Sequence, residues 1–289
     1  MPQFLLNHDS FLNVEATADN VAHRLGVLLG ILTAARESPF RVAMTDNCWF
    51  AQVTIDFRLD EILFDPNDTI LEYDVRIAFQ QVLNGITELS CDTVDDAVGN
   101  IRANRDAVGL ISCPSTFECE NTDGIVTIRK ESEILNFYRQ CFEIEDVNAD
   151  RFFELGTLAF PGLEFALEHT RFNRFSGNYR DLRRVSVVHL AAVNDGFRRI
   201  HGECAGHAAN VENAFRAEYH VDISKESDNT HRNKAAMHER NVKVGAITHC
   251  CEWHTKFEKT KNRIHFDPSA NPDIAGKILI GIFVDHLTV

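Results

Sequence analysis

Polar and apolar residues alternate in two short segments near the end of the chain, residues 252–258 and 263–266. Alternation with a period of two is typical of strands that bury one face. Because every second side chain of a strand points to the same side, the pattern predicts two strands of a hairpin with one polar face. That face would carry Glu252, His254, Lys256, Arg263 and His265. Behind it, the apolar side chains Trp253, Phe257, Ile264 and Phe266 would be buried.

The patterns along the whole chain predict an α+β protein in three parts. Residues 1–145 read as a mixed α/β region, residues 146–224 as a helical region, and residues 225–289 as a helix followed by an antiparallel sheet. We interpret the first part as a sensor or partner-docking region and the last as a nuclease module. No internal repeat or low-complexity segment interrupts this order.

Individual elements can also be predicted from their caps and periodicity. Thr17 is a suitable N-cap for a helix that ends near Arg36, ahead of Pro39. The remaining expectations are strands within residues 40–64, helices over 73–89, 92–104 and 131–142, a strand over 124–128, and long helices over 184–219 and 228–240.

Composition places the chain among ordinary globular proteins. Its 289 residues are 44% hydrophobic and 25% charged, and no run of 18 apolar residues predicts a membrane span. The start of the sequence has no signal-peptide pattern, and the eight cysteines show no paired short spacings. We therefore expect a cytoplasmic protein with reduced thiols, not associated with membranes.

Charge is distributed unevenly. The formal net charge is −14, yet residues 225–289 hold ten Lys+Arg against eight Asp+Glu and six of the 13 histidines. The acidic balance of the rest argues against non-specific binding along nucleic acid, although it leaves room for a locally basic site. The acidic residues 1–224 are equally compatible with a mask over that basic end.

The helix expected over residues 228–240 contributes to such a site. Its spacing would place His231, Lys234 and His238 on one face, with Arg232 and Arg240 on the flanks. A basic, histidine-bearing helix beside the polar hairpin face predicts a surface that binds the phosphates of a substrate. A solvated helix face without a ligand explains the same residues.

Two C-terminal segments, residues 262–266 (Asn-Arg-Ile-His-Phe) and 277–283 (Lys-Ile-Leu-Ile-Gly-Ile-Phe), support a resemblance. This arrangement resembles the C-terminal sheet of RelE/HigB-type ribonuclease toxins, in which an R-I-x-F strand precedes an apolar strand. The resemblance covers about residues 228–289. It implies a small sheet backed by helices and cleavage of RNA without a metal, with Arg263 at the position of the family's strand arginine.

The hairpin residues also suit this chemistry on their own terms. Cleavage of RNA without a metal requires a base, an acid and cations that stabilise the developing charge. Histidine ordinarily titrates near neutral pH, so one of His254 and His265 would serve as base and the other as acid, and Glu252 would act as the base itself or orient His254. Lys256 and Arg263 would stabilise the phosphorane, although Arg263 could equally form a structural ion pair across the hairpin.

Metal sites are less well supported by the spacings. A zinc site from His249, Cys250, Cys251 and His254, or from His201, Cys204 and His207, would not provide two separated ligand pairs. Glu252 and Lys256 are four residues apart, whereas metal-dependent nucleases use an E-x-K strand. The sequence therefore predicts neither a metal nor another cofactor.

These observations define two hypotheses about function. The first is a toxin-like effector of a bacterial stress or phage-defence system that cleaves RNA by metal-independent acid–base chemistry. RNA and an antitoxin-like regulatory protein would be its partners. The second is a non-catalytic sensor or scaffold subunit of a larger defence complex.

Overall fold

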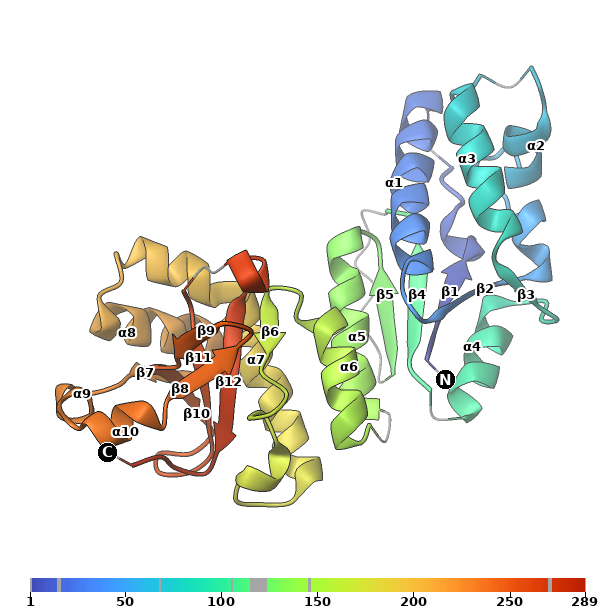
Figure 1. Ribbon diagram of the computed structural model, residues 1–289. Helices are drawn as coiled ribbons and strands as arrows, with labels where there is room; N and C mark the ends of the chain where they lie inside the picture. The colour runs from blue at the N-terminus through green and yellow to red at the C-terminus, as the bar shows by residue number, and fades with distance from the viewer. Residues whose placement is uncertain are drawn as a thin grey trace. The chain divides into compact units, whose positions relative to one another are not determined.

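The computed structural model describes residues 2–14, 17–67, 69–104, 106–114, 124–144, 147–269 and 272–288. The chain is an α+β protein, as predicted, and it divides into two compact units, Met1–Asp146 and Val147–Val289. Figure 1 shows both units along the chain. The helical segment 146–224 and the segment 225–289, which the sequence separates, thus fold together in the second unit.

The first unit is built on a five-stranded parallel sheet with the order β3-β2-β1-β4-β5. Its strands are β1 (Gln3–Asn7), β2 (Arg41–Thr45), β3 (Thr87–Leu89), β4 (Val108–Ser112) and β5 (Ile125–Ile128). The central strand β1 carries three consecutive buried residues, because helices cover both faces of a parallel sheet. The strand order reverses direction at β1, as in doubly wound α/β folds.

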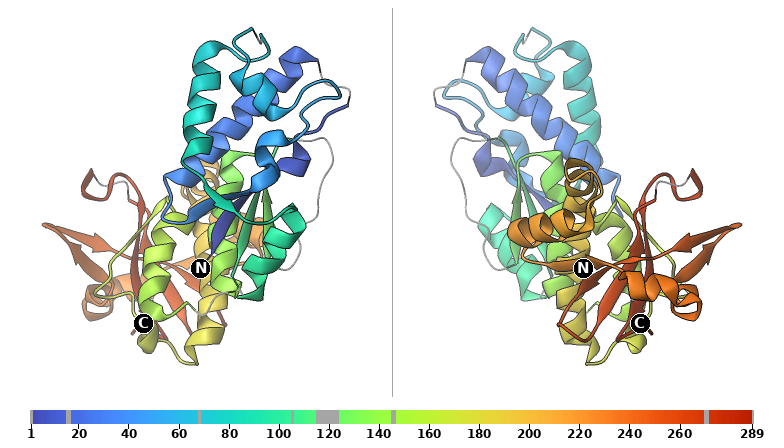
Figure 2. Two further views of the ribbon diagram at one scale, coloured as in Figure 1. Left: turned by 90° about the vertical axis from the view of Figure 1, so that its right-hand side faces the viewer. Right: turned by 90° about the vertical axis from the view of Figure 1, so that its left-hand side faces the viewer.

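Helices lie on both faces of this sheet (Figure 2). They are α1 (Ala18–Arg36), α2 (Leu59–Phe64), α3 (Tyr73–Asn84), α4 (Val94–Ala103) and α5 (Ile134–Ile144), with the short 3-10 helices η1 (His8–Ser10), η2 (Asp46–Phe50) and η3 (Glu131–Glu133). On one face α4 packs against Leu5, and on the other Phe137 of α5 meets Phe4 at a ring distance of 4.4 Å. Helix α1 begins as predicted, since the Thr17 hydroxyl accepts the backbone N–H of Asn20.

The strands predicted within residues 40–64 are only partly correct. Strand β2 forms, but residues 51–58 make a turn closed by an isolated bridge between Gln52 and Arg58. The Thr54 hydroxyl accepts the N–H groups of Asp56 and Phe57, which favours a turn over an extended strand. Residues 59–64 are helical, and the helix predicted over 73–89 ends at Asn84, before β3.

The second unit contains the predicted C-terminal sheet, with the order β6-β12-β11-β10-β7. Its strands are β6 (Leu163–Phe165), β7 (Asp222–Lys225), β10 (Trp253–Lys256), β11 (Arg263–Asp267) and β12 (Ile278–Val284). All neighbours are antiparallel except β6 and β12. A separate antiparallel pair, β8 (Asn241–Val244) and β9 (Ile247–Cys250), precedes β10 in the chain.

Five α-helices and two 3-10 helices complete the described part of this unit. They are α6 (Ala149–Ala159), η4 (Phe172–Arg174), α7 (Tyr179–Glu203), α8 (Ala208–Tyr219), α9 (Asp228–Arg232) and α10 (Lys234–His238), followed by η5 (Pro272–Ile274). Although α7 has 25 residues, no helix in the described ranges is both long and apolar enough to cross a membrane.

Two long helices predicted from the sequence are each divided in two. The helix expected over 184–219 breaks between α7 and α8, where Ala205 and Gly206 have positive φ angles of 47° and 73°. The helix expected over 228–240 breaks at Asn233, whose side chain caps α10 by accepting the N–H of Ala236 at 3.2 Å. The extended backbone at Asn233 turns α10 out of line with α9.

The apolar face of the sheet packs against α7. Phe197 of α7 meets the rings of Trp253 at 5.2 Å and Phe266 at 4.9 Å. Trp253, Ile264 and Phe266 are buried as predicted, whereas Phe257 is only half-buried. The hairpin therefore presents its histidines on the face opposite α7.

Candidate functional site

The register of the sheet brings four predicted residues onto one face. His254 lies opposite His265, and Lys256 lies opposite Arg263 in the β10–β11 pair. The two imidazole rings are 4.8 Å apart between centroids and 35° from parallel. The alternation in the sequence thus predicted the geometry of this pair correctly.

Glu252 does not lie in this pair of strands, because β10 begins one residue later. Its carboxylate contacts Lys225 Nζ at 3.0 Å and His231 Nε2 at 3.3 Å, at one end of the strands. The sequence placed Glu252 beside His254, but in the structure another carboxylate occupies that place.

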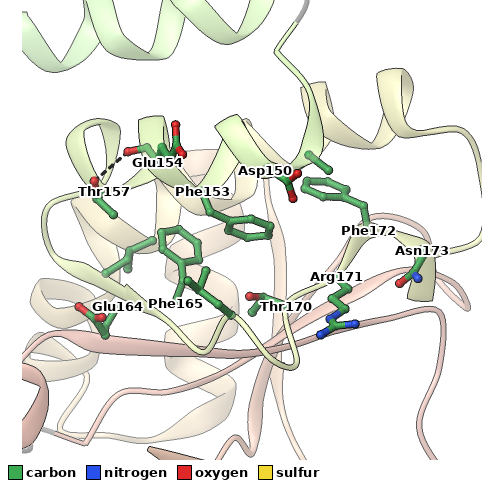
Figure 3. A pocket seen from close by; sticks show the side chains of 13 residues that line it. Asp150, Phe153, Glu154, Thr157, Glu164, Phe165, Thr170, Arg171, Phe172 and Asn173 are labelled. Carbon is green, nitrogen blue, oxygen red and sulfur yellow. Dashed lines mark hydrogen bonds between the residues drawn. The ribbon is translucent and has the colours of Figure 1, made fainter. Parts of the chain in front are cut away.

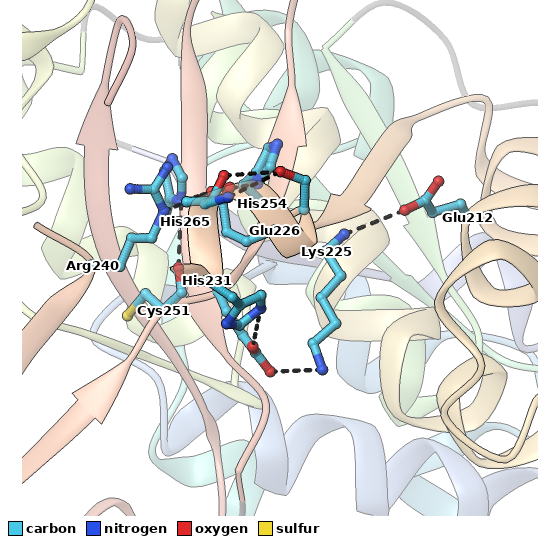
Figure 4. A network of polar contacts seen from close by, with 11 residues as sticks. Glu212, Lys225, Glu226, His231, Arg240, Cys251, His254 and His265 are labelled. Atoms are coloured by element: carbon cyan, nitrogen blue, oxygen red, sulfur yellow. Dashed lines mark hydrogen bonds and ion pairs between the residues drawn. The ribbon is translucent and has the colours of Figure 1, made fainter. Parts of the chain in front are cut away.

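That carboxylate belongs to Glu226, which the sequence analysis missed. Glu226 Oε1 lies 3.5 Å from His254 Nδ1, 3.8 Å from His265 Nδ1 and 2.7 Å from Arg240 Nε (Figure 4). Arg240 also donates from Nη1 to the carbonyl of Ala236 at 2.6 Å. The segment 226–240, with its two short helices, therefore closes over the histidine face. We call Glu226, Arg240, His254, Lys256, Arg263 and His265 the central site.

The backbone explains how Glu226 reaches its position. Its N–H donates to the carbonyl of Glu252 at 2.9 Å, which extends the β7–β10 ladder by one further bond. Ser224 lies opposite His254 in that ladder, so Glu226, two residues on, points to the same side. In the sequence, only the two-residue spacing between Ser224 and Glu226 indicated that Glu226 faces the histidines. Strand β7 is too short to be recognised from its pattern alone.

Burial separates the central site from open solvent. His265 and Arg240 are 0% exposed, His254 is 4% exposed, and Glu226 and Arg263 are each 9% exposed. Lys256 is half-buried, so the site approaches the surface at its Lys256 edge. The polar face expected at the surface is thus covered, because segment 226–240 lies over it.

Burial and nearby cations lower the pKa of both histidines. The pKa of His265 falls to about 3, first because of burial and then because of the Arg240 charge, and its hydrogen bond to the Cys251 carbonyl only partly offsets this. Burial also lowers the pKa of His254 well below its usual value, and His265 and Arg263 add to the effect. Both imidazoles are therefore neutral near pH 7.

The hydrogen bond to Cys251 also fixes the tautomer of His265. A carbonyl oxygen only accepts, so His265 Nδ1 carries the proton in its 3.3 Å contact with Cys251 O. His265 Nε2 then holds a lone pair, and this buried atom has no hydrogen-bond partner among the described residues. A neutral imidazole with a free lone pair is suited to accept a proton.

Other polar atoms of the central site also lack hydrogen-bond partners in the described part of the chain. Two of them, Arg240 Nη2 and Arg263 Nε, carry protons that they could donate. A third, His254 Nδ1, lies 3.5 Å from Glu226 Oε1, which is longer than an ordinary hydrogen bond. Buried polar groups normally pair with protein, water or a ligand. Because guanidinium groups only donate, their natural partner is an anion such as a phosphate.

A divalent cation fits part of the same geometry. One ligand atom each of Glu226, His254 and His265 lies within 4.8 Å of the others. The distances of 3.5 and 3.8 Å from Glu226 Oε1 to the two histidines are close to the edge of about 3.4 Å in a tetrahedral zinc site. However, Arg240 Nε already lies 2.7 Å from that oxygen, and Arg263 adds a second positive charge nearby. The charges therefore suit an anion better than a cation.

The sequence-derived zinc sets are not assembled. His249 Nδ1 contacts Asp267 Oδ2 at 2.9 Å, and Glu226, His254 and His265 form the one ligand group found in the described part of the chain. The seven cysteines in the described ranges form no disulfide, and Cys119 lies outside these ranges. Burial raises the pKa of the Cys251 thiol and keeps it protonated.

The basic face predicted on segment 228–240 is wrong as a single helical face. The break at Asn233 separates His231 on α9 from Lys234 and His238 on α10. Arg232, Lys234 and His238 are exposed, His231 pairs with Glu252, and Arg240 is buried in the central site. Of the five predicted substrate-binding residues, only Arg240 joins the two histidines.

Comparison of the chain with protein-family models, curated proteins and solved structures gives no match. The function of the chain is therefore inferred from the geometry of the central site.

Proposed function

We propose that the second unit cleaves RNA by metal-independent general acid–base chemistry at the central site. The observation that carries this proposal is the pair of facing neutral histidines beside one carboxylate and two buried guanidinium groups. This set supplies a proton acceptor, a group that can return a proton, and donors for a phosphate. The resemblance of segments 262–266 and 277–283 to RelE/HigB-type toxins supports the same substrate.

In this proposal, His265 Nε2 or the matching nitrogen of His254 takes the proton from a ribose 2′-hydroxyl. The 2′-oxygen forms a bond to phosphorus, the bond from phosphorus to the 5′-oxygen breaks, and the second imidazole protonates that leaving oxygen. Glu226 orients His254 through the 3.5 Å contact with Nδ1. Arg263 and Lys256 stabilise the charge that develops on the phosphate oxygens.

The acid step requires a protonated imidazole, although the low pKa values leave both histidines neutral in the free protein. In the free protein, burial and the charges of Arg240 and Arg263 keep both rings neutral. A bound phosphate adds negative charge beside them, and this raises the pKa of both imidazoles. Protonation of the acid is therefore coupled to substrate binding.

Burial requires a movement of the covering segment. His254 and His265 are almost fully enclosed, so RNA enters the central site only when residues 227–239, between Glu226 and Arg240, shift. The segment is built from two five-residue helices joined at Asn233. Helices this short have little stability of their own, so they can move while the buried Glu226–Arg240 pair stays in place.

A cleavage assay tests this proposal directly. Purified full-length protein is incubated with a mixed-sequence RNA in excess EDTA, alongside His254→Ala and the control His238→Ala. His238 is an exposed histidine of the covering segment that is not part of the central site. Cleavage by the native protein and the control, but not by His254→Ala, is expected.

The metal centre is the second candidate, because Glu226, His254 and His265 have ligand-like spacing. Loss of cleavage in EDTA, restored by one divalent metal, would favour it over the acid–base site. Absence of cleavage under all conditions would favour the non-catalytic sensor or scaffold role. As an active ribonuclease, the protein would act as a toxin-like defence effector held in check by a regulatory protein.

A further inference from the structure

The second unit contains a pocket that the central site does not use. Its volume is about 740 Å³, and it lies between α6, β6 and the segment leading to η4 (Figure 3). Strand β12 separates β6 from β11, so the pocket is distinct from the two histidines. A cavity of this size accommodates a small organic molecule.

Aromatic rings from three different elements line the pocket. Phe153 of α6 lies 5.6 Å from Phe165 of β6 and 6.0 Å from Phe172 of η4, measured between ring centroids. Phe165 and Phe172 are buried, Phe153 is half-buried, and Leu167 stands at the rim with 60% exposure. The rings therefore present apolar surface and aromatic edges or faces to an occupant.

Carboxylates stand along the same pocket. Asp150 and Glu154 are both exposed on α6, and neither has an ion-pair partner among the described residues. Glu164 on β6 is already neutralised by Lys277 Nζ at 3.2 Å. Arg171 supplies the one positive charge in the lining, on the segment across from α6 in Figure 3. The unpaired charge on the α6 wall is thus negative.

We infer that this pocket binds a small organic cation with a flat aromatic body. The faces of aromatic rings attract cations, and adjacent carboxylates add a direct charge interaction. The apolar part of the ligand would cover Phe153, Phe165 and Phe172, while its amine would face Asp150 and Glu154. This inference is independent of the proposed ribonuclease activity.

The test compares two probes that share a ring and differ in charge, tryptamine and indole-3-acetate. Binding to the full-length protein is measured by titration calorimetry or by saturation-transfer NMR. Tryptamine is expected to bind and indole-3-acetate to bind at least several-fold more weakly. Equal binding of the two probes, or no binding of either, overturns the inference.

Variants of the lining residues test whether tryptamine binds in this pocket and whether negative charge favours its binding. Glu154→Gln should weaken tryptamine binding about threefold to tenfold, and Arg171→Gln should strengthen it, because each change removes one charge of known sign. Phe153→Ala should abolish it. Glu168→Gln, an exposed acid of the neighbouring segment outside the pocket lining, serves as the control. Tryptamine binding that is unchanged in both Glu154→Gln and Arg171→Gln would contradict the assignment.

Discussion

Glu226 and Arg240 form a buried ion pair, with Glu226 Oε1 2.7 Å from Arg240 Nε. Their side chains are only 4% and 0% exposed. The pair joins the two ends of the segment that covers the central site, and the same Glu226 oxygen faces both histidines of the sheet beneath it. One contact thus links the stability of the cover to the electrostatics of the central site.

Breaking this pair on one side should destabilise the protein strongly. Arg240→Met leaves the Glu226 carboxylate buried without a cation, and a loss of about 3–5 kcal/mol in the free energy of unfolding is expected. The double variant Glu226→Leu with Arg240→Met should recover most of that loss, since no charge remains buried. Urea denaturation of both variants checks the expectation. Equal stability of the single and double variants would argue against a coupled pair.

Stability should depend on pH through the central histidines. Burial lowers the folded-state pKa of His265 to about 3 and that of His254 well below its usual value. The unfolded chain therefore binds more protons below about pH 6.5, and the free energy of unfolding falls as the pH drops from there toward 3. Each histidine contributes a slope of up to ~1.4 kcal/mol per pH unit.

This pH dependence can be assigned by substitution. His265→Phe should flatten the decline in stability between pH 6 and 4, measured by urea denaturation at a series of pH values. His238→Gln, at an exposed position, should leave the slope unchanged. An unaltered slope in His265→Phe would show that the buried imidazole is not the titrating group.

The two carboxylates near the hairpin should differ in their importance for cleavage. Glu252 pairs with Lys225 and His231, whereas Glu226 faces the histidines. Glu252→Ala should therefore change the rate of RNA cleavage less than about threefold, and Glu226→Gln should lower it by about 10²-fold or more. Folding of each variant is verified by circular dichroism. The reverse order of effects would restore Glu252 as the functional carboxylate.

Cations at the open edge of the central site should stabilise the transition state. Arg263→Ala is expected to lower kcat by about 10²-fold, and Arg263→Lys should restore only part of it, because lysine cannot donate two parallel hydrogen bonds. Lys259→Ala provides the control, since Lys259 is exposed and lies outside the central site. A similar kcat for Arg263→Ala and Lys259→Ala would remove Arg263 from the mechanism.

The sequence is sufficient to predict the hairpin but not segment 226–240, which lies over its histidine face. Strand alternation is local, so it predicted that His254 and His265 share a face with Lys256 and Arg263. The contact with Glu226 depends on pairing between β7 and β10, which are far apart in the chain. No local pattern encodes that pairing, and this is why Glu226 and the burial of the histidines were missed.

The helix boundaries were missed for a related reason. Asn233 caps α10 with its side chain, although asparagine is also tolerated inside helices. Ala205 adopts a positive φ that alanine rarely favours, so nothing at that position signals the end of α7. In the first unit, the short apolar strands β1 and β4 have no periodicity that distinguishes them from buried helix.

The ends of the RNA products report most directly on how the phosphodiester bond is cleaved. A short RNA is cleaved by the full-length protein in EDTA, and the fragments are analysed by mass spectrometry. Attack by the 2′-oxygen predicts 2′,3′-cyclic phosphate and 5′-hydroxyl ends, and no fragments from the same RNA with 2′-deoxyribose throughout. Products with 5′-phosphate ends, or cleavage of the 2′-deoxy strand, would contradict metal-independent acid–base cleavage at His254 and His265.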